Sequence, residues 1–299
     1  DKFSKAFRSF AEKHMEDLLD FVSFANKKGV EIGHGYHVGR IAWGSEISSR
    51  NASTSRLAQT LGVEEIVASS KTALVIGRDG RMVRANEMEG VETRNMQELY
   101  DYCMHYGIKI KLSPTVIRQF GSMQVFDEIC GQVDRNGGNY NVYIDESVPG
   151  EITITSVKAI DNDLSFGELL FSQFEFVDRN TAFARLVEGD LSTLPFLDKT
   201  FYDRLVSLEK NNWEELDKIG MEQVDIRTPS EIEALKDRIR GVVGQLKDLV
   251  GQNAIRLLKP EEWESEDIPS KLEELYHDRF LGEGYLSKLC AVRADTGSL

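Results

Sequence analysis

Apolar side chains along the first third of the chain follow two different periods. They recur at near-helical spacing over 3–27, which predicts an amphipathic helix. Residues 29–43 hold four glycines and alternating β-formers, which favours strands joined by tight turns. A second helix is predicted over 53–61. Two apolar runs within 71–88 flank Asp79-Gly80, and this dipeptide favours a tight turn, so the segment predicts a β-hairpin.

The pattern then becomes mainly helical. Helical spacing predicts helices over 96–106 and over 114–130, and the second of these begins at a proline. Two strands, 141–145 and 151–161, follow as a second hairpin. Nearly all of 198–289 again has helical spacing with charged faces.

This order predicts an α+β fold of two lobes. The small, strand-rich lobe would cover 1–90, including the N-terminal helix, and the large helical lobe would cover 91–299. Small-molecule sites usually lie in clefts of the kind that two such lobes form.

Composition narrows the class of partner. The 299 residues carry a formal net charge of −14, with 41 % hydrophobic and 29 % charged residues, which is typical of a soluble globular protein. Nucleic acids and anionic membranes reward clustered Lys and Arg, so the acidity argues against both as main partners. No stretch approaches the roughly 20 apolar residues of a membrane span. The three Cys show no metal-ligand spacing.

The candidate chemistry lies around the second hairpin. Asp134 opens a polar loop after an apolar helix, Asn139 stands just before the first strand, and Asp161 ends the second. A hairpin that starts after Asn139 and ends at Asp161 brings these two side chains close together. Phosphoryl transfer needs one carboxylate to orient the attacking hydroxyl, and an Asn plus an Asp to hold magnesium. We expect Arg135 to pair with a carboxylate.

The same residues resemble a known superfamily. The Asp134-Arg135-x-x-x-Asn139 spacing and the Ile-Asp-Asn-Asp-Leu-Ser-Phe-Gly run that contains Asp161 are similar to the catalytic and metal-binding loops of atypical kinases. The relatives are the phosphatidylinositol 3- and 4-kinases, actin-fragmin kinase and the secretory-pathway casein kinases. The resemblance implies a kinase-like fold with Asp134 as the catalytic aspartate and with Asn139 and Asp161 as metal ligands. Asp163 stands where several relatives have Gly.

A second stretch is also similar. Residues 47–70 resemble the helix-C region of bacterial atypical-kinase-like proteins, and 85–90 then fall where the hinge between the lobes would lie. By this position, Met88 and Glu89 are candidates for binding adenine through their backbone. The similarity suggests a bacterial protein, either cytoplasmic or secreted into a host cell as an effector.

The phosphate-binding cation departs from the usual kinase pattern. Kinases usually hold the α- and β-phosphates with a strand Lys, and no Val-Ala-Ile-Lys-like strand occurs here. Arg40 and Lys28 are the nearest candidates.

The resemblance implies an enzyme that uses ATP and Mg²⁺ to phosphorylate a hydroxyl, on a protein rather than a lipid. AMPylation or ligation on the same fold, and a pseudokinase that binds partners, are the alternatives. An activating partner protein is left open.

Overall fold

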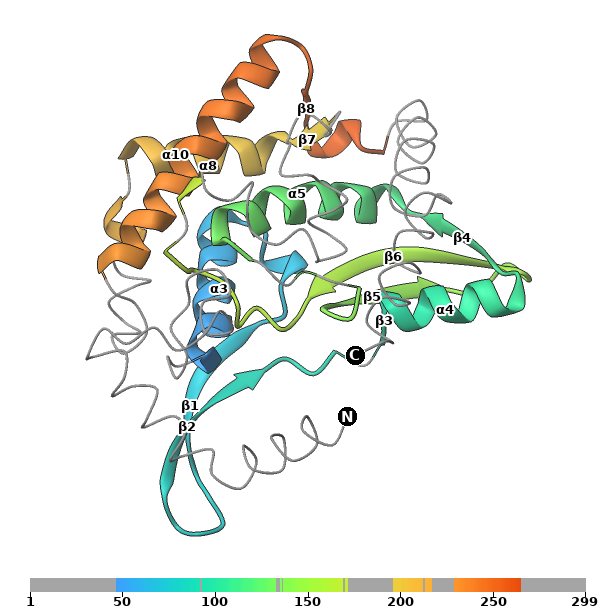
Figure 1. Cartoon of the computed structure of the whole chain (residues 1–299). Coiled ribbons are helices and arrows are strands. Elements are labelled where there is room, and N and C mark those ends of the chain that lie inside the picture. The colour runs from blue at the N-terminus through green and yellow to red at the C-terminus, as the bar shows by residue number, and fades with distance from the viewer. Residues whose placement is uncertain are drawn as a thin grey trace, which may run out of the picture.

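The computed structural model describes residues 47–91, 93–132, 135, 137–168, 170–171, 196–211, 213–216 and 229–264. Helices and strands are mixed along these ranges, so the predicted α+β class is confirmed (Figure 1). The elements are α3 (Ile47–Leu61), η2 (Glu64–Ile66), β1 (Ser70–Ile76), β2 (Met82–Met88), β3 (Arg94–Asn95), α4 (Met96–Tyr106), β4 (Lys109–Leu112), α5 (Pro114–Cys130), β5 (Tyr140–Asp145), β6 (Glu151–Ala159), β7 (Phe196–Asp198), α8 (Lys199–Asn211), α10 (Pro229–Gly251), β8 (Arg256–Leu258) and η4 (Pro260–Glu262).

A four-stranded sheet with the order β3-β5-β6-β4 carries the second predicted hairpin. The strands β5 and β6 are antiparallel, and Tyr140 lies opposite Ala159 at the open end of their hairpin. The strand β4 pairs parallel to β6 at the outer edge, with Ile110 beside Ile152. The sequence pattern missed β4, because a strand of four residues shows too little alternation to be recognised without its distant partner.

The helix α5 lies between this sheet and α10 (Figure 1), and every residue from Gln119 to Cys130 is buried. The Ser113 hydroxyl caps its first turn by accepting the amide of Val116, and Pro114 occupies the first turn, where a missing N–H costs nothing. Gly131 ends the helix with a φ of 64°, a backbone region that glycine enters without strain. These local signals explain why the sequence placed this helix correctly.

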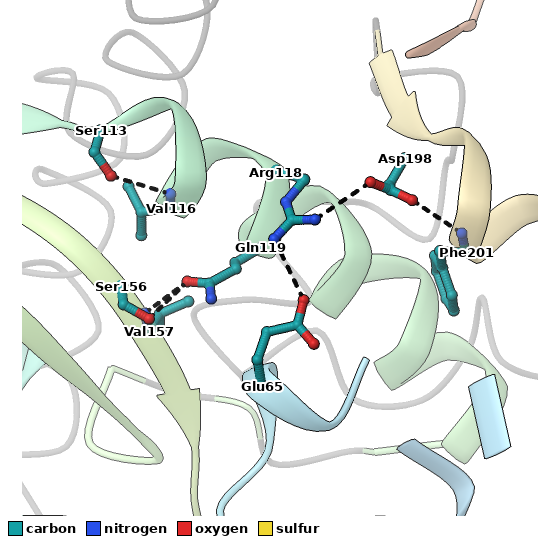
Figure 2. Close-up of polar contacts among 9 residues, drawn as sticks. All are labelled: Glu65, Ser113, Val116, Arg118, Gln119, Ser156, Val157, Asp198 and Phe201. Carbon is teal, nitrogen blue, oxygen red and sulfur yellow. Dashed lines mark hydrogen bonds and ion pairs between the residues drawn. The ribbon is translucent and has the colours of Figure 1, made fainter. Parts of the chain in front are cut away.

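Buried polar side chains join α5 to the elements around it. Figure 2 shows Gln119 of α5, whose Oε1 accepts hydrogen bonds from the Ser156 hydroxyl at 3.0 Å and the Val157 amide at 2.9 Å, both on β6. On another side of the helix, Arg118 lies 3.6 Å from Glu65 and 3.5 Å from Asp198. The sheet, η2 and β7 are therefore all fastened to the one central helix.

The strands β1 and β2 form the first predicted hairpin, with Ser70 opposite Met88 and Ile76 opposite Met82. Gly80, with a φ of 80°, lies in its turn as the Asp-Gly pair predicts. The turn end projects away from the four-stranded sheet (Figure 1), and apolar side chains near it are largely exposed: Leu74 by 68 %, Ile76 by 74 % and Met82 by 71 %.

Buried apolar residues on both sides of residue 90 belong to one core, which runs from Leu57 of α3 through α5 to Leu246 of α10. The segment before β1 is also joined to the sheet, because the Ala68 amide donates to the carbonyl of Ala159 at 2.9 Å. A division into two lobes at residue 90 therefore stays a prediction. The predicted helix at 3–27 and the glycine-rich strands at 29–43 lie outside the described residues.

The C-terminal helical region is partly confirmed. The helices α8 and α10 lie where helical spacing predicts them, but β7 and β8 pair in parallel, with Leu197 beside Leu257. Within the described ranges, no helix combines the length and the apolar character needed to cross a bilayer.

Candidate functional site

The hairpin of β5 and β6 places Asn139 and Asp161 at the same end of the sheet. The register runs out at the pair of Tyr140 and Ala159, and the next residues stay paired because the Ile160 amide donates to the Asn139 carbonyl at 2.9 Å. Asp161 follows immediately. The backbones of Asn139 and Asp161 therefore lie close together, as a hairpin between them requires. That their side chains meet stays a prediction.

Asp161 adopts a backbone conformation that is unusual for a residue with a side chain. Its φ is 54°, and its carbonyl accepts a hydrogen bond from Gln132 Nε2 at 3.2 Å. Phe166, five residues later, also has a positive φ, of 65°, and is fully buried. Such conformations persist only where the surrounding structure enforces them, and they gather at functional sites.

Arg135 is the centre of the structure that enforces this loop. Its side chain is only 2 % exposed and makes a bidentate ion pair with Asp127 of α5, with both N–O distances at 2.9 Å. Its Nη1 donates to the carbonyls of Asn139, at 2.7 Å, and Ile160, at 2.8 Å. Its Nη2 also contacts Oδ1 of Asn162. One guanidinium therefore holds α5, the residue before β5 and the loop after β6 together.

The ion pair between Arg135 and Asp127 is shielded from water. Burial raises the pKa of the Asp127 carboxyl above its ordinary value, and the charge and hydrogen bonds of Arg135 oppose that shift. Arg135 was expected to pair with a carboxylate, and Asp127 is that partner.

The first turns of α3 hold the same loop from another side. Asn51 Oδ1 accepts the amide of Asn162 at 2.6 Å. Arg50, 1 % exposed, donates to the carbonyl of Ser165 at 2.8 Å and pairs with Glu231 of α10 at 2.7 Å. Arg50 and Asn51 are therefore buried where they bind the loop after β6.

The third support comes from α10. Arg238, fully buried, donates to the carbonyls of Ile129 at 2.9 Å, Gly167 at 3.0 Å and Cys130 at 3.4 Å. It thereby satisfies carbonyls at the C-terminus of α5 that no intrahelical amide reaches. Burial lowers the pKa of Arg238 to about 10, so the side chain stays charged at neutral pH.

We call these contacts around residues 160–167, made by Asn51, Arg50, Arg135 and Arg238, the loop clamp. Sequence reasoning found Arg135 through its motif but gave no role to the other three, whose partners in the loop lie from 71 to 115 residues away along the chain. The composition of α3 is one signal that could have pointed to them. Its first turns are rich in polar residues, whereas Leu57, Ala58 and Leu61 on its last turns predict a helix that packs in the core.

The hinge candidates Met88 and Glu89 have different surroundings. Met88 ends β2 and is 41 % exposed. The amide of Glu89 donates to the Ser69 carbonyl at 2.8 Å, and its carboxylate pairs with Lys158. The Glu89 amide is therefore engaged within the protein, and its assignment to adenine stays a prediction.

The other predicted site residues, Asp134, Arg40 and Lys28, lie outside the described residues. Among the described residues, no three His, Cys, Asp or Glu side chains gather as a metal site. Magnesium takes one or two protein oxygens and completes its shell with phosphate and water. The roles of Asn139 and Asp161 as its ligands stay a prediction.

Comparison with known proteins gives little further guidance. No protein-family model matches the chain, and no curated protein sequence matches it. Among solved structures, the chain is similar to the crystal structure of CtkA, a proinflammatory kinase of Helicobacter pylori. The two are 13 % identical, with a TM-score of 0.35, and the similarity covers 72 % of this chain and 86 % of that one. At this degree of similarity, no activity is carried over from that protein.

Proposed function

We propose that this protein is a phosphotransferase that uses ATP and Mg²⁺ to phosphorylate a hydroxyl group, as an atypical protein Ser/Thr kinase does. The observation that carries the proposal is the pairing of Asn139 with Ile160, directly before Asp161, at the open end of the β5–β6 hairpin. An amide oxygen and a carboxylate at that end match the metal ligands that phosphoryl transfer requires.

In this proposal, Asn139 and Asp161 hold Mg²⁺ on the phosphates, and Asp134 orients the attacking hydroxyl. Bound Mg²⁺ would neutralise the charge that develops on the transferred phosphoryl group. The loop clamp supports this assignment, because it fixes the backbone on both sides of Asp161 before any substrate binds. Electrostatic catalysis depends on ligands whose geometry is set in advance in this way.

A protein acceptor fits the chain better than a lipid or a nucleic acid. The formal net charge of −14 opposes approach to an anionic bilayer or to a phosphate backbone. A protein that presents a Ser or Thr hydroxyl need not carry a dense negative charge, so it would not be repelled in this way.

The test has two stages, with a matched pair of variants. Calorimetric titration with Mg-ATP should show binding that Asp161→Asn abolishes and that Asp145→Asn keeps. Asp145 is the last residue of β5, at the turn end of the same hairpin and away from Asp161. Its Oδ1 accepts the Ser147 amide at 2.9 Å, and an Asn side chain can make the same contact. Intact-mass spectrometry after incubation with Mg-ATP and a cell extract should then show a phosphoryl gain that Asp134→Asn and Asp161→Asn remove.

Other outcomes change or overturn the proposal. A gain of one AMP mass would keep the nucleotide site and replace the reaction by nucleotidyl transfer. Nucleotide binding without any modification would make the chain a pseudokinase. Absence of Mg-ATP binding by the unaltered protein would overturn the proposal altogether.

A further inference from the structure

The base of the β1–β2 hairpin is fastened to the sheet that carries the candidate site. Just after β2, both carboxylate oxygens of Glu89 lie 2.5 Å from Lys158 Nζ on β6. Glu89 Oε2 also accepts the amide of Ser69, just before β1, at 3.0 Å. A single carboxylate therefore bridges the residues flanking both strands of the hairpin and β6.

A second contact reinforces the first from the neighbouring strand. Asn141 of β5 lies directly opposite Lys158, so the two side chains share one face of the sheet. Asn141 Nδ2 donates to the carbonyl of Val91 at 3.4 Å. The cross-strand pair of Lys158 and Asn141 therefore holds the segment 89–91 at two points.

These contacts lie close to the proposed metal ligands. Lys158 precedes Asp161 by three residues and Asn141 follows Asn139 by two, which corresponds to about 10 Å and about 7 Å along the strands. The next pair toward the site, Tyr140 and Ala159, is also involved, because the Ala159 carbonyl accepts the Ala68 amide. Any movement of the hairpin base relative to β6 would therefore change the distance between the hairpin and Asp161.

We propose that Glu89 and Lys158 form a latch that sets the position of the β1–β2 hairpin over the β5–β6 loop ends and thereby the affinity for nucleotide. The inference rests on the proposed function, since it places the nucleotide between these two hairpins. Glu89 and Lys158 are positioning residues in this view. The carboxylate of Glu89 belongs to the latch in this proposal, because both of its oxygens contact Lys158.

The chain offers a matched control for the latch. Lys71 and Glu87 form an ion pair at 3.1 Å across the same hairpin, and both side chains are more than 60 % exposed. That pair has the same chemistry as Lys158 and Glu89 but joins β1 only to β2. Glu87→Gln therefore removes a comparable charge without touching the sheet.

The experiment measures the dissociation constant for a non-hydrolysable Mg-ATP analogue in the full chain. Glu89→Gln and Lys158→Met should each weaken binding about two- to fivefold, as expected for a partly exposed ion pair. The exchanged variant Glu89→Lys with Lys158→Glu restores the ion pair but not the hydrogen bond from the Ser69 amide, because a Lys side chain cannot accept it. It should therefore recover part of that loss, and Glu87→Gln should bind like the unaltered protein. In turnover assays, Lys158→Met should raise KM more than it lowers kcat.

Amide hydrogen exchange supplies an independent readout. In Glu89→Gln, the amide of Ser69 should exchange faster, since it donates to the carboxylate that is removed. If Asp161→Asn abolishes nucleotide binding while the latch variants bind normally, the latch is wrong and the proposed function stands. If the unaltered protein binds no nucleotide, both fail. Equal loss in Glu89→Gln and Glu87→Gln would also overturn the latch, because the effect would then be one of net charge.

Discussion

The loop at 160–167 and the β1–β2 hairpin both adjoin the end of β6, but they are held in opposite ways. The loop is fixed by four side chains from α3, α10 and the segment before β5, and three of them are buried arginines. The hairpin leaves apolar side chains in solvent and is joined to the sheet by a partly exposed ion pair and a few backbone contacts.

Under the proposed function, this difference would serve two tasks, the binding of a metal by the loop and the covering of a nucleotide by the hairpin. Metal ligands must keep their geometry to within a fraction of an ångström, and buried guanidinium groups with fixed planar donors provide that rigidity. A segment that covers a nucleotide must instead admit and release it, and such segments come from the less stable parts of a structure. The comparison therefore predicts that changes in the loop clamp cost stability, whereas changes in the hairpin affect mainly binding.

The largest effect is expected at Arg135. Replacing it by Met leaves Asp127 buried without its ion-pair partner and removes donors from the carbonyls of Asn139 and Ile160. We expect Arg135→Met to lower the free energy of unfolding by about 3–5 kcal/mol, measured by urea denaturation. Arg118→Met is the control, since Arg118 also pairs with carboxylates but is 30 % exposed, and it should cost about 1 kcal/mol or less. Equal costs for the two variants would show that the loop clamp has no special role.

A smaller effect is expected from the pH dependence of the latch. The hydrogen bond from Lys158 is the main cause that holds the pKa of Glu89 below its ordinary value of 4.5, and the Ser69 amide adds to it. The ionised form is therefore favoured in the folded state. The contribution to stability is fully present above pH 4.5 and is lost as the pH falls through the lowered pKa.

The measurement compares unfolding of the unaltered protein and Glu89→Gln across this range. The difference should be at most about 1 kcal/mol near neutral pH, because solvent screens a partly exposed pair, and it should shrink on acidification. A difference that grew as the pH fell would contradict the assigned direction.

The smallest effect is expected at the end of the hairpin. Ile76 is 74 % exposed, so Ile76→Ala removes almost no buried surface and should change the free energy of unfolding by no more than about 0.5 kcal/mol. Ile66→Ala, at a fully buried position of η2, is the matched comparison and should cost about 2–5 kcal/mol. Thermal unfolding of both variants checks this, and a large loss for Ile76→Ala would mean that its side chain is covered in solution.

The sequence by itself determined the local features of this protein. The hairpin around Gly80, the helix α4 and the capped helix α5 follow from turn residues, helical spacing and caps, all of which act between near neighbours. The backbone proximity of Asn139 and Asp161 follows from the same logic, because a hairpin brings its two ends together.

Only the tertiary structure decided which distant residues meet. Arg50 and Asn51 reach the loop after β6, Arg238 reaches the end of α5, and Glu89 finds Lys158 on another strand. An arginine or a glutamate has the same sequence signature whether it is solvated or paired in the core. Its partner is set by how the helices pack on the sheet, and that packing depends on the whole core rather than on any short stretch of chain.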